Sequence, residues 1–254
     1  MPTALIVEDE PAANGLLAML VQLRGYRTDS AFTGDEALRK ADDHLPDLVF
    51  LDLMLPDING YEVCKALKAR RATGGIPVVM VTARLADENR VQGFRAGAVE
   101  YIPKPYTPDQ IFGAMSRADS WRSRLDATDP SGELALDASE EVAHLLAASD
   151  LRSLLLARTA LDEDEVGRLG STLLDLLQRG VDWGRAHRRD LVATLDYAIG
   201  PDRVAFRLLD RSGWFEDDDP GRGEVAALLA RGGFETVEVL DGRELRLARG
   251  VARP

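Results

Sequence analysis

Polar side chains that could do chemistry follow four short, largely apolar segments in the first half of the chain. The segments cover residues 4–7, 48–51, 78–81 and 99–103, and the residues after them are Glu8 with Asp9, Asp52, Thr82 and Lys104. Carboxylates suit a hard divalent cation, and positive charge together with hydroxyl donors suits a transferring phosphoryl group. The pattern indicates a carboxylate, Asp52, that accepts a phosphoryl group beside a metal ion and counter-charges.

The elements that must position these residues alternate along residues 1–121. Strands are predicted near residues 4–8, 27–32, 47–52, 77–82 and 99–102, and helices near 12–24, 34–43, 59–70, 86–96 and 108–121. Apolar strands separated by amphipathic helices predict a five-stranded parallel sheet covered on both faces. Ligands bind such sheets beyond the carboxyl ends of the strands, so we expect the polar residues to converge there.

Length and composition limit the classes of protein to consider. A chain of 254 residues is long enough to form two domains. Its net charge of −12 argues against nonspecific binding to nucleic acid. The single cysteine, Cys64, excludes an internal disulfide and a cysteine-cluster zinc site. We find neither an apolar run long enough to span a membrane nor a signal peptide. We therefore expect a cytoplasmic protein that does not bind membranes.

The second half of the chain has a different order of patterns. Residues 122–132 lose the apolar periodicity and are expected to form a linker, which leaves residues 133–254 as a second domain. The predicted helices cover residues 139–148, 162–179 and 223–231, and the predicted hairpins pair 191–197 with 203–209 and 236–240 with 244–248. Helices on one side of a mostly antiparallel sheet predict an α+β two-layer sandwich.

The first 121 residues resemble the receiver domain of two-component response regulators. The matching motifs are Glu8-Asp9, the run 52–60, Thr82-Ala83 and the run 101–105, in the order and spacing of that family. The resemblance implies a doubly wound, flavodoxin-like fold in which Asp52 takes the phosphoryl group from a histidine kinase or phosphotransfer protein. It also implies Mg²⁺ held by Glu8, Asp9, Asp52 and the backbone carbonyl of Met54.

The same resemblance implies roles for Lys104, Thr82 and Tyr101. Lys104 would pair with a phosphoryl oxygen, and its peptide bond to Pro105 would be cis. The hydroxyl of Thr82 would donate to the phosphoryl group, and Tyr101 would rotate inward as the switch. Asp57, in the loop after Asp52, is expected to stabilise a turn or cap a helix and not to bind metal.

Residues 133–250 look like the ATPase fold shared by histidine kinases and anti-sigma factors, but with departures at its nucleotide boxes. The positions that match this nucleotide site are Asp175, Asp210, Gly213, Gly221 and Gly223. Asp175 stands in place of the metal-binding Asn and Ser171 in place of the Glu, while Ser212 and Trp214 replace glycines that let the backbone approach the nucleotide. We therefore expect a degenerate domain that does not hydrolyse ATP and that has lost ATP or ADP as a cofactor.

Three functions follow from these patterns. The preferred one is a phosphorelay response regulator, not an enzyme, whose Asp52 controls binding of a regulatory protein by the second domain. The alternatives are a receiver-gated, ATP-dependent protein kinase of the anti-sigma type and a DNA-binding transcription regulator. A homodimer through the face around Tyr101 is left open.

Overall fold

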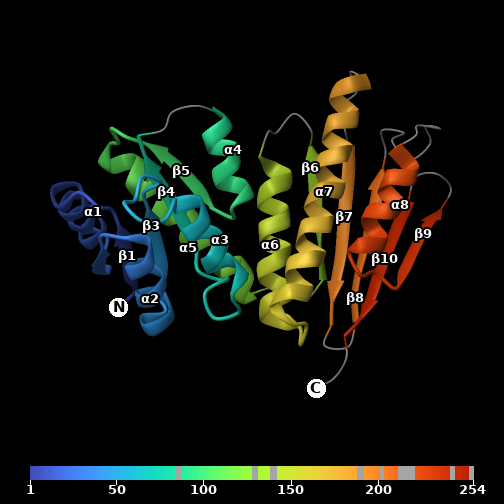
Figure 1. Cartoon of the computed structure of the whole chain (residues 1–254), viewed down its shortest axis with the longest axis horizontal. Coiled ribbons are helices and arrows are strands. Elements are labelled where there is room, and N and C mark those ends of the chain that lie inside the picture. Colours follow the sequence, from blue (N-terminus) through green and yellow to red (C-terminus); the bar gives the residue numbers. More distant parts are fainter. Residues whose placement is uncertain are drawn as a thin grey trace. The chain divides into compact units, whose positions relative to one another are not determined.

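The computed structural model divides into two compact units, Met1–Ala127 and Thr128–Pro254 (Figure 1). It describes residues 1–83, 87–127, 131–137, 142–187, 192–200, 203–210, 221–240 and 244–251. Each unit contains one five-stranded sheet. Among the described residues, no helix has the length and apolar character needed to cross a membrane.

The sheet of the first unit is parallel throughout, as the sequence predicts. Its strands are β1 (Thr3–Val7), β2 (Arg27–Ala31), β3 (Leu48–Leu51), β4 (Val78–Thr82) and β5 (Glu100–Pro103). They lie in the order β2-β1-β3-β4-β5, so that β1 is bonded between β2 and β3. The strand order reverses at β1, which places the carboxyl ends of β1 and β3 at the switch point of the sheet.

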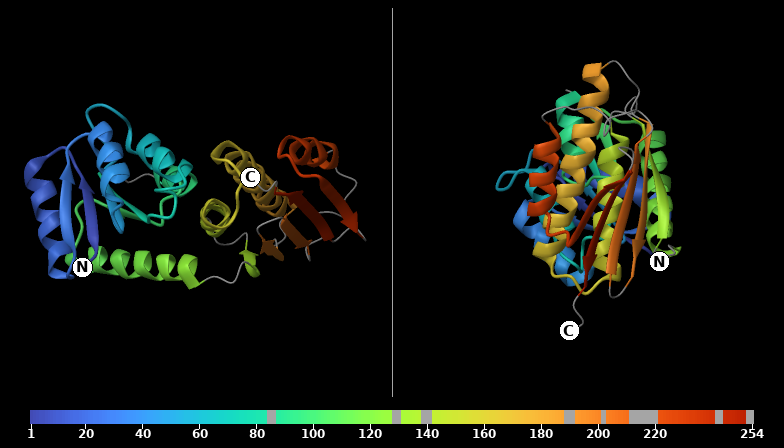
Figure 2. Two further views of the ribbon diagram at one scale, coloured as in Figure 1. Left: turned by 90° about the horizontal axis from the view of Figure 1, so that it is seen from below. Right: turned by 90° about the vertical axis from the view of Figure 1, so that its right-hand side faces the viewer.

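Five helices cover both faces of this sheet and confirm the doubly wound fold. They are α1 (Pro11–Leu23), α2 (Gly34–His44), α3 (Gly60–Ala69), α4 (Asp87–Arg95) and α5 (Pro108–Ala127). The helices α1 and α5 share one face with a buried cluster that includes Leu17, Phe50 and Met115, and α2 packs beside α3 on the other (Figure 2).

Local caps begin the helices that follow the strand ends. The side chain of Glu10 accepts bonds from the backbone N–H groups of Ala12 and Ala13, and Pro11 occupies the first helical position of α1. Asn59 caps α3 in the same way, since its side chain accepts a bond from Tyr61 N. Such caps satisfy N–H groups that have no partner inside the helix, so both loops leave their strands with a fixed geometry.

The last helix of the first unit is longer than the sequence predicts. We expected it to end near residue 121, but α5 continues to Ala127. Trp121 is buried, and Lys68 of α3 places its ammonium 4.3 Å from the centre of the Trp121 ring. Arg122, one residue further on, forms an ion pair with Asp47. These tertiary contacts stabilise a stretch whose sequence alone has the polar character of a linker.

The second unit is an α+β domain. Its strands are β6 (Ser131–Asp137), β7 (Val192–Ile199), β8 (Arg203–Asp210), β9 (Thr236–Leu240) and β10 (Glu244–Gly250), in the antiparallel order β6-β7-β8-β10-β9. Its helices are α6 (Ala143–Arg158), α7 (Glu163–His187) and α8 (Gly221–Arg231). Both predicted hairpins and all three predicted helices are present, although α6 and α7 extend further toward the C-terminus than expected. Strand β6 was not predicted.

Apolar and charged residues alternate along the strands of this sheet, which explains why helices cover one face only. Leu195, Leu208 and Leu245 are opposite one another on three neighbouring strands, and all three are buried. The next row across the same strands consists of Asp196, Arg207 and Arg246. Helices cover one face of this sheet (Figure 2), and neighbouring residues along a strand point to opposite faces, so the buried apolar row belongs to the covered face and the charged row to the other.

Candidate functional site

The carboxyl ends of three parallel strands bring an ammonium group and two carboxylates into direct contact. Glu8 follows β1, Asp52 follows β3 and Lys104 follows β5. The Nζ atom of Lys104 donates to Asp52 Oδ2 at 2.6 Å and also donates to Glu8 Oε2. Side chains that are far apart in the sequence therefore form one charged cluster at the edge of the sheet.

Asp9 adds a third carboxylate to this cluster. One oxygen from each of Glu8, Asp9 and Asp52 lies within 4.8 Å of the others. Glu8 and Asp52 are only 4% and 6% exposed, whereas Asp9 is open to solvent. Oxygen ligands at this separation, with one side accessible, suit a hard dication that keeps part of its water shell. The residues present therefore fit a magnesium ion.

Burial and the attraction between opposite charges act in opposite directions on the pKa values of Glu8 and Lys104. Burial raises the pKa of Glu8, the nearby Asp52 raises it further, and the bond from Lys104 offsets only part of that rise. Burial alone would lower the pKa of Lys104, but its hydrogen bonds to Asp52 and Glu8 outweigh burial and raise the pKa. Lys104 thus stays charged and compensates buried negative charge.

Backbone bonds fix the positions of these side chains. Asp52 N donates to Val7 O at 2.9 Å, and Lys104 N donates to Thr82 O at 2.8 Å. The N–H of Met54 donates to Asp52 Oδ1 at 3.1 Å, which orients the carboxylate. The backbone of Gly60 lies so close to Asp52 that an added Cβ would be 2.3 Å from the Asp52 carbonyl oxygen. A glycine is required at that approach.

Asn14 is a positioning residue that the sequence interpretation missed. It is buried on α1, and its Nδ2 donates to the carbonyl oxygens of Ile6 and Glu8, both at 3.3 Å. Ser30 Oγ donates to Asn14 Oδ1 at 2.6 Å, so the amide is held from the neighbouring strand as well. The sequence did offer one signal for this role, because Asn14 is a polar residue on the buried face of the helix predicted over residues 12–24.

The two residues expected to act as a switch are both buried in this structure. Thr82 ends β4 and is fully buried, and Tyr101 of β5 is 8% exposed. The ring of Tyr101 lies against α4, where a Cβ added at Gly93 would be 3.1 Å from Tyr101 Cδ2. Tyr101 thus occupies an inward position beside α4.

Two smaller expectations agree with the structure. The side chain of Asp57 accepts bonds from Gly34 N at 2.8 Å and Asp35 N at 2.9 Å, so it caps α2. The peptide bond between Lys104 and Pro105 is cis.

Comparison with known families decides what kind of domain carries this cluster. The family model described as "Response regulator receiver domain" matches residues 4–116. Residues 4–116 are a response regulator receiver domain. The matched range contains every member of the acidic cluster, its lysine and both expected switch residues.

The receiver domain also accounts for the similarity to individual proteins. "Transcriptional regulatory protein ResD" of Bacillus subtilis (strain 168) is 39% identical over 130 residues, which are 50% of this chain and 53% of ResD. "Transcriptional regulatory protein TcrA" of Mycobacterium tuberculosis (strain ATCC 25618 / H37Rv) is 40% identical over 138 residues, or 54% of this chain and 53% of TcrA. The chain therefore spans about half the length of these relatives.

Solved receiver structures are similar over the same share of the chain. The crystal structure of a CheY-like response regulator receiver domain protein from Methanospirillum hungatei JF-1 is 30% identical, with a TM-score of 0.45. That likeness covers 49% of this chain and 98% of the solved chain.

Outside the receiver domain, the residues expected at a nucleotide site are spread over three elements of the second unit. Asp175 is exposed on α7, and Asp210 is buried at the end of β8. Gly221 and Gly223 lie in the first turn of α8, and Gly213 lies outside the described residues. Their grouping around a nucleotide remains a prediction.

Proposed function

We propose that Asp52 accepts a phosphoryl group from the phosphohistidine of a histidine kinase or phosphotransfer protein. The carrying observation is the contact of Lys104 with both Asp52 and Glu8, beside Asp9. A carboxylate oxygen of Asp52 forms the new bond to phosphorus as the bond from phosphorus to the histidine nitrogen breaks. The product is an acyl phosphate on Asp52.

The other cluster residues neutralise and orient the transferred group. Lys104 exchanges part of its contact with the carboxylates for a phosphoryl oxygen, and the Thr82 hydroxyl donates to another. Glu8, Asp9 and Asp52, with the Met54 carbonyl, would hold Mg²⁺, which supplies positive charge at the phosphoryl oxygens. Binding of Thr82 to the phosphoryl group is the step that would alter the packing of Tyr101 and α4.

An exposed apolar stripe beside the site supports a protein as the phosphoryl donor. Leu16, Met19 and Leu23 are 54%, 61% and 72% exposed, and their spacing places them along one side of α1. That helix begins two residues after Asp9. A partner that covers the stripe would deliver its phosphohistidine next to Asp52.

Labelling of the full chain tests the assignment of Asp52. Radioactive acetyl phosphate with Mg²⁺ should label the unmodified chain and not an Asp52→Asn variant. Asp109→Asn, an exposed change in the first turn of α5, is the matched control and should be labelled normally. Label that persists on Asp52→Asn would disprove the assignment.

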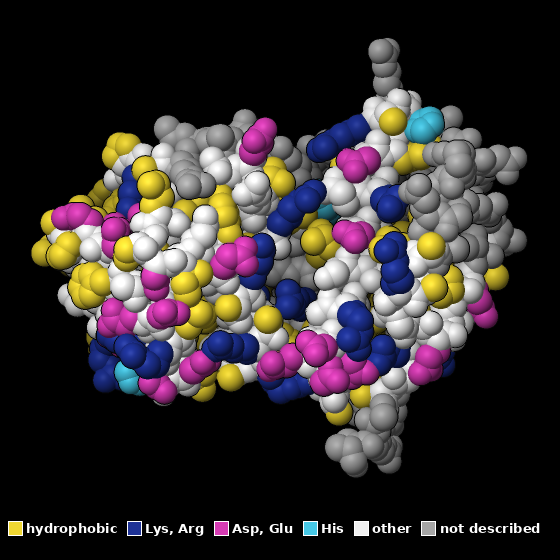
Figure 3. Space-filling view, in the orientation of Figure 1, with side chains coloured by type: hydrophobic (Ala, Val, Ile, Leu, Met, Phe, Trp, Pro, Cys, Tyr) yellow, Lys and Arg dark blue, Asp and Glu magenta, His cyan; other side chains and the backbone are white. Residues whose placement is uncertain are grey.

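We further propose that the phosphorylated receiver controls binding of a regulatory protein by the second unit. Its element order supports a degenerate member of the ATPase fold of anti-sigma factors, and Asp175 and Ser171 at the expected metal-binding positions count against catalysis. ResD and TcrA are named transcriptional regulatory proteins, which makes DNA binding the alternative output. Acidic and basic side chains are mixed on the face seen in Figure 3, and the net charge of −12 disfavours a DNA-binding surface.

Partner capture separates these outputs. The full chain, with and without beryllofluoride as a mimic of the phosphoryl group, should retain different proteins. A set of captured partners that does not change with beryllofluoride would contradict the switch.

Calorimetry of the full chain with ATP tests the kinase alternative, which requires clear nucleotide binding. A mobility shift with DNA at low salt tests the transcription alternative.

A further inference from the structure

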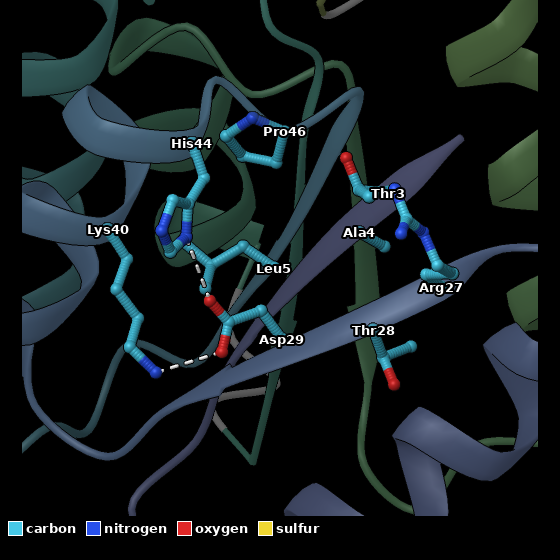
Figure 4. Close-up of a pocket in the computed structure, with 9 residues that line it drawn as sticks. All are labelled: Thr3, Ala4, Leu5, Arg27, Thr28, Asp29, Lys40, His44 and Pro46. Atoms are coloured by element: carbon cyan, nitrogen blue, oxygen red, sulfur yellow. Dashed lines mark hydrogen bonds and ion pairs between the residues drawn. The ribbon is translucent and has the colours of Figure 1, made fainter. Parts of the chain in front are cut away.

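A cavity lies at the end of the receiver sheet opposite the acidic cluster. It has a volume of about 400 Å³ and is bounded by the C-terminal half of α2 and the first residues of β1 and β2 (Figure 4). Thr3 and Arg27 begin these two strands, whereas Glu8 and Asp9 follow the other end of β1. The cavity is therefore separate from the proposed phosphorylation site, and its size is in the range of small-molecule sites.

Two of the basic side chains in this cavity, Lys40 and His44, already contact an acid. Lys40 Nζ lies 2.9 Å from Asp29 Oδ1, and His44 Nδ1 lies 3.2 Å from Asp29 Oδ2, as the dashed lines in Figure 4 show. Lys40 also forms an ion pair with Glu36 at 3.2 Å. This wall of the cavity thus holds its charges in internal pairs.

Arg27 differs from these two residues. It lines the other side of the cavity, is exposed, and makes no side-chain hydrogen bond or ion pair within the part of the chain that the structure describes. A guanidinium group presents a planar pair of donors that matches a carboxylate or phosphate. The cavity therefore offers a cation that an anionic ligand can use without breaking an existing pair.

The backbone of β2 adds one donor and one acceptor. This strand is the edge of the sheet, and Arg27 N and Ala31 O bond toward β1, so the alternate residues Thr28 and Ser30 point their backbone groups outward. The N–H of Ser30 donates to Asp29 Oδ1 at 2.8 Å instead of to another strand, and Ser30 O accepts from Lys40 Nζ at 2.5 Å. Within β2 as the structure describes it, the outward N–H and C=O of Thr28 are the backbone groups left available, which is too little for an added β-strand and sufficient for a small molecule.

We propose that this cavity binds a small monocarboxylate with an apolar body. The carboxylate pairs with Arg27, and the body lies along the part of the cavity lined by Leu5 and Pro46. Asp29 disfavours a second negative charge, so a dicarboxylate or a phosphate dianion fits less well. The proposal does not depend on phosphorylation of Asp52.

Nuclear magnetic resonance of the full ¹⁵N-labelled chain tests this site with phenylacetate and hexanoate as probes. We expect saturable shifts at Thr28 and His44 with both carboxylates, and at least tenfold weaker binding of the neutral probe phenylacetamide. The Arg27→Gln variant should weaken phenylacetate binding at least tenfold. Arg39→Gln removes the same charge from an exposed position of α2 outside the cavity and should bind phenylacetate normally.

The outcomes separate the site from nonspecific association. Equal binding of phenylacetate and phenylacetamide, unchanged binding by Arg27→Gln, or the absence of saturable shifts with both carboxylates would overturn the proposal. Because the Arg27 side chain is exposed and unpaired in the described structure, Arg27→Gln should fold normally, and its unliganded spectrum checks this.

Discussion

Lys104 Nζ lies 2.6 Å from Asp52 Oδ2, so the last strand of the receiver sheet neutralises a buried carboxylate at the end of the central one. The same ammonium contacts Glu8. One cation therefore compensates two acids that have little access to water, and this arrangement leads to the first prediction.

Replacement of Lys104 by Met should slow labelling of Asp52 by acetyl phosphate on the order of 100-fold, because a donor to the phosphoryl oxygens is lost. The free energy of unfolding should fall by about 2 kcal/mol, below the usual cost of breaking a buried pair because Lys104 is 22% exposed. Rates of labelling and urea unfolding at pH 7 measure the two effects. Labelling at the unmodified rate would contradict the role of Lys104.

Magnesium should stabilise the chain through Asp9. Addition of millimolar Mg²⁺ should raise the unfolding temperature of the unmodified chain, and an Asp9→Asn variant should show little of that increase. Asp9 is exposed, so the variant should keep its fold without metal. Thermal unfolding with and without Mg²⁺ is the measurement, and Asp109→Asn should respond as the unmodified chain does. An equal response from Asp9→Asn would remove Asp9 from the metal site.

Much of the receiver domain could be predicted from sequence because its signals are local. Apolar strands such as residues 48–51 end at single polar residues, and parallel strands bring those ends together. The C-terminal end of α5 and the start of the second sheet could not be predicted in this way. The segment 122–127 is helical because Trp121 and Arg122 bind distant residues, which no local pattern reveals.

Strand β6 was missed for a similar reason. Within residues 131–137, only Leu134 and Leu136 are large apolar residues, too few to distinguish a strand from a linker. Its pairing with β7 supplies the missing constraint. Asn14 was missed because its role depends on carbonyl groups of β1 that only the folded chain brings near α1.

The cap of α2 by Asp57 predicts a pH-dependent contribution to stability. Burial alone would raise the pKa of Asp57, but the backbone N–H groups of Asp35 and Gly34 outweigh burial and lower it. The stabilisation is therefore present above the unfolded-state pKa and is lost as the pH falls through the lower folded-state pKa. At pH 7, Asp57→Ala should lower the free energy of unfolding by about 1 kcal/mol.

Urea unfolding at several pH values tests the predicted direction of this pH dependence. The difference between Asp57→Ala and the unmodified chain should be constant from about pH 6 to 8 and should shrink below about pH 4, near the ordinary pKa of an aspartate. A difference that grows on acidification would show that Asp57 acts in another way.

A pair of glycines gives opposite expectations for the same substitution. Gly60→Ala would place a Cβ 2.3 Å from the carbonyl oxygen of Asp52, so the backbone beside the phosphoacceptor must move. We expect a loss of about 1–3 kcal/mol of stability and slower labelling of Asp52. Gly15→Ala meets no atom within 4 Å inside α1 and should stabilise the chain by up to about 1 kcal/mol with labelling unchanged. If both variants had equal stability and equal labelling rates, the close approach of Gly60 would not be what holds Asp52 in position.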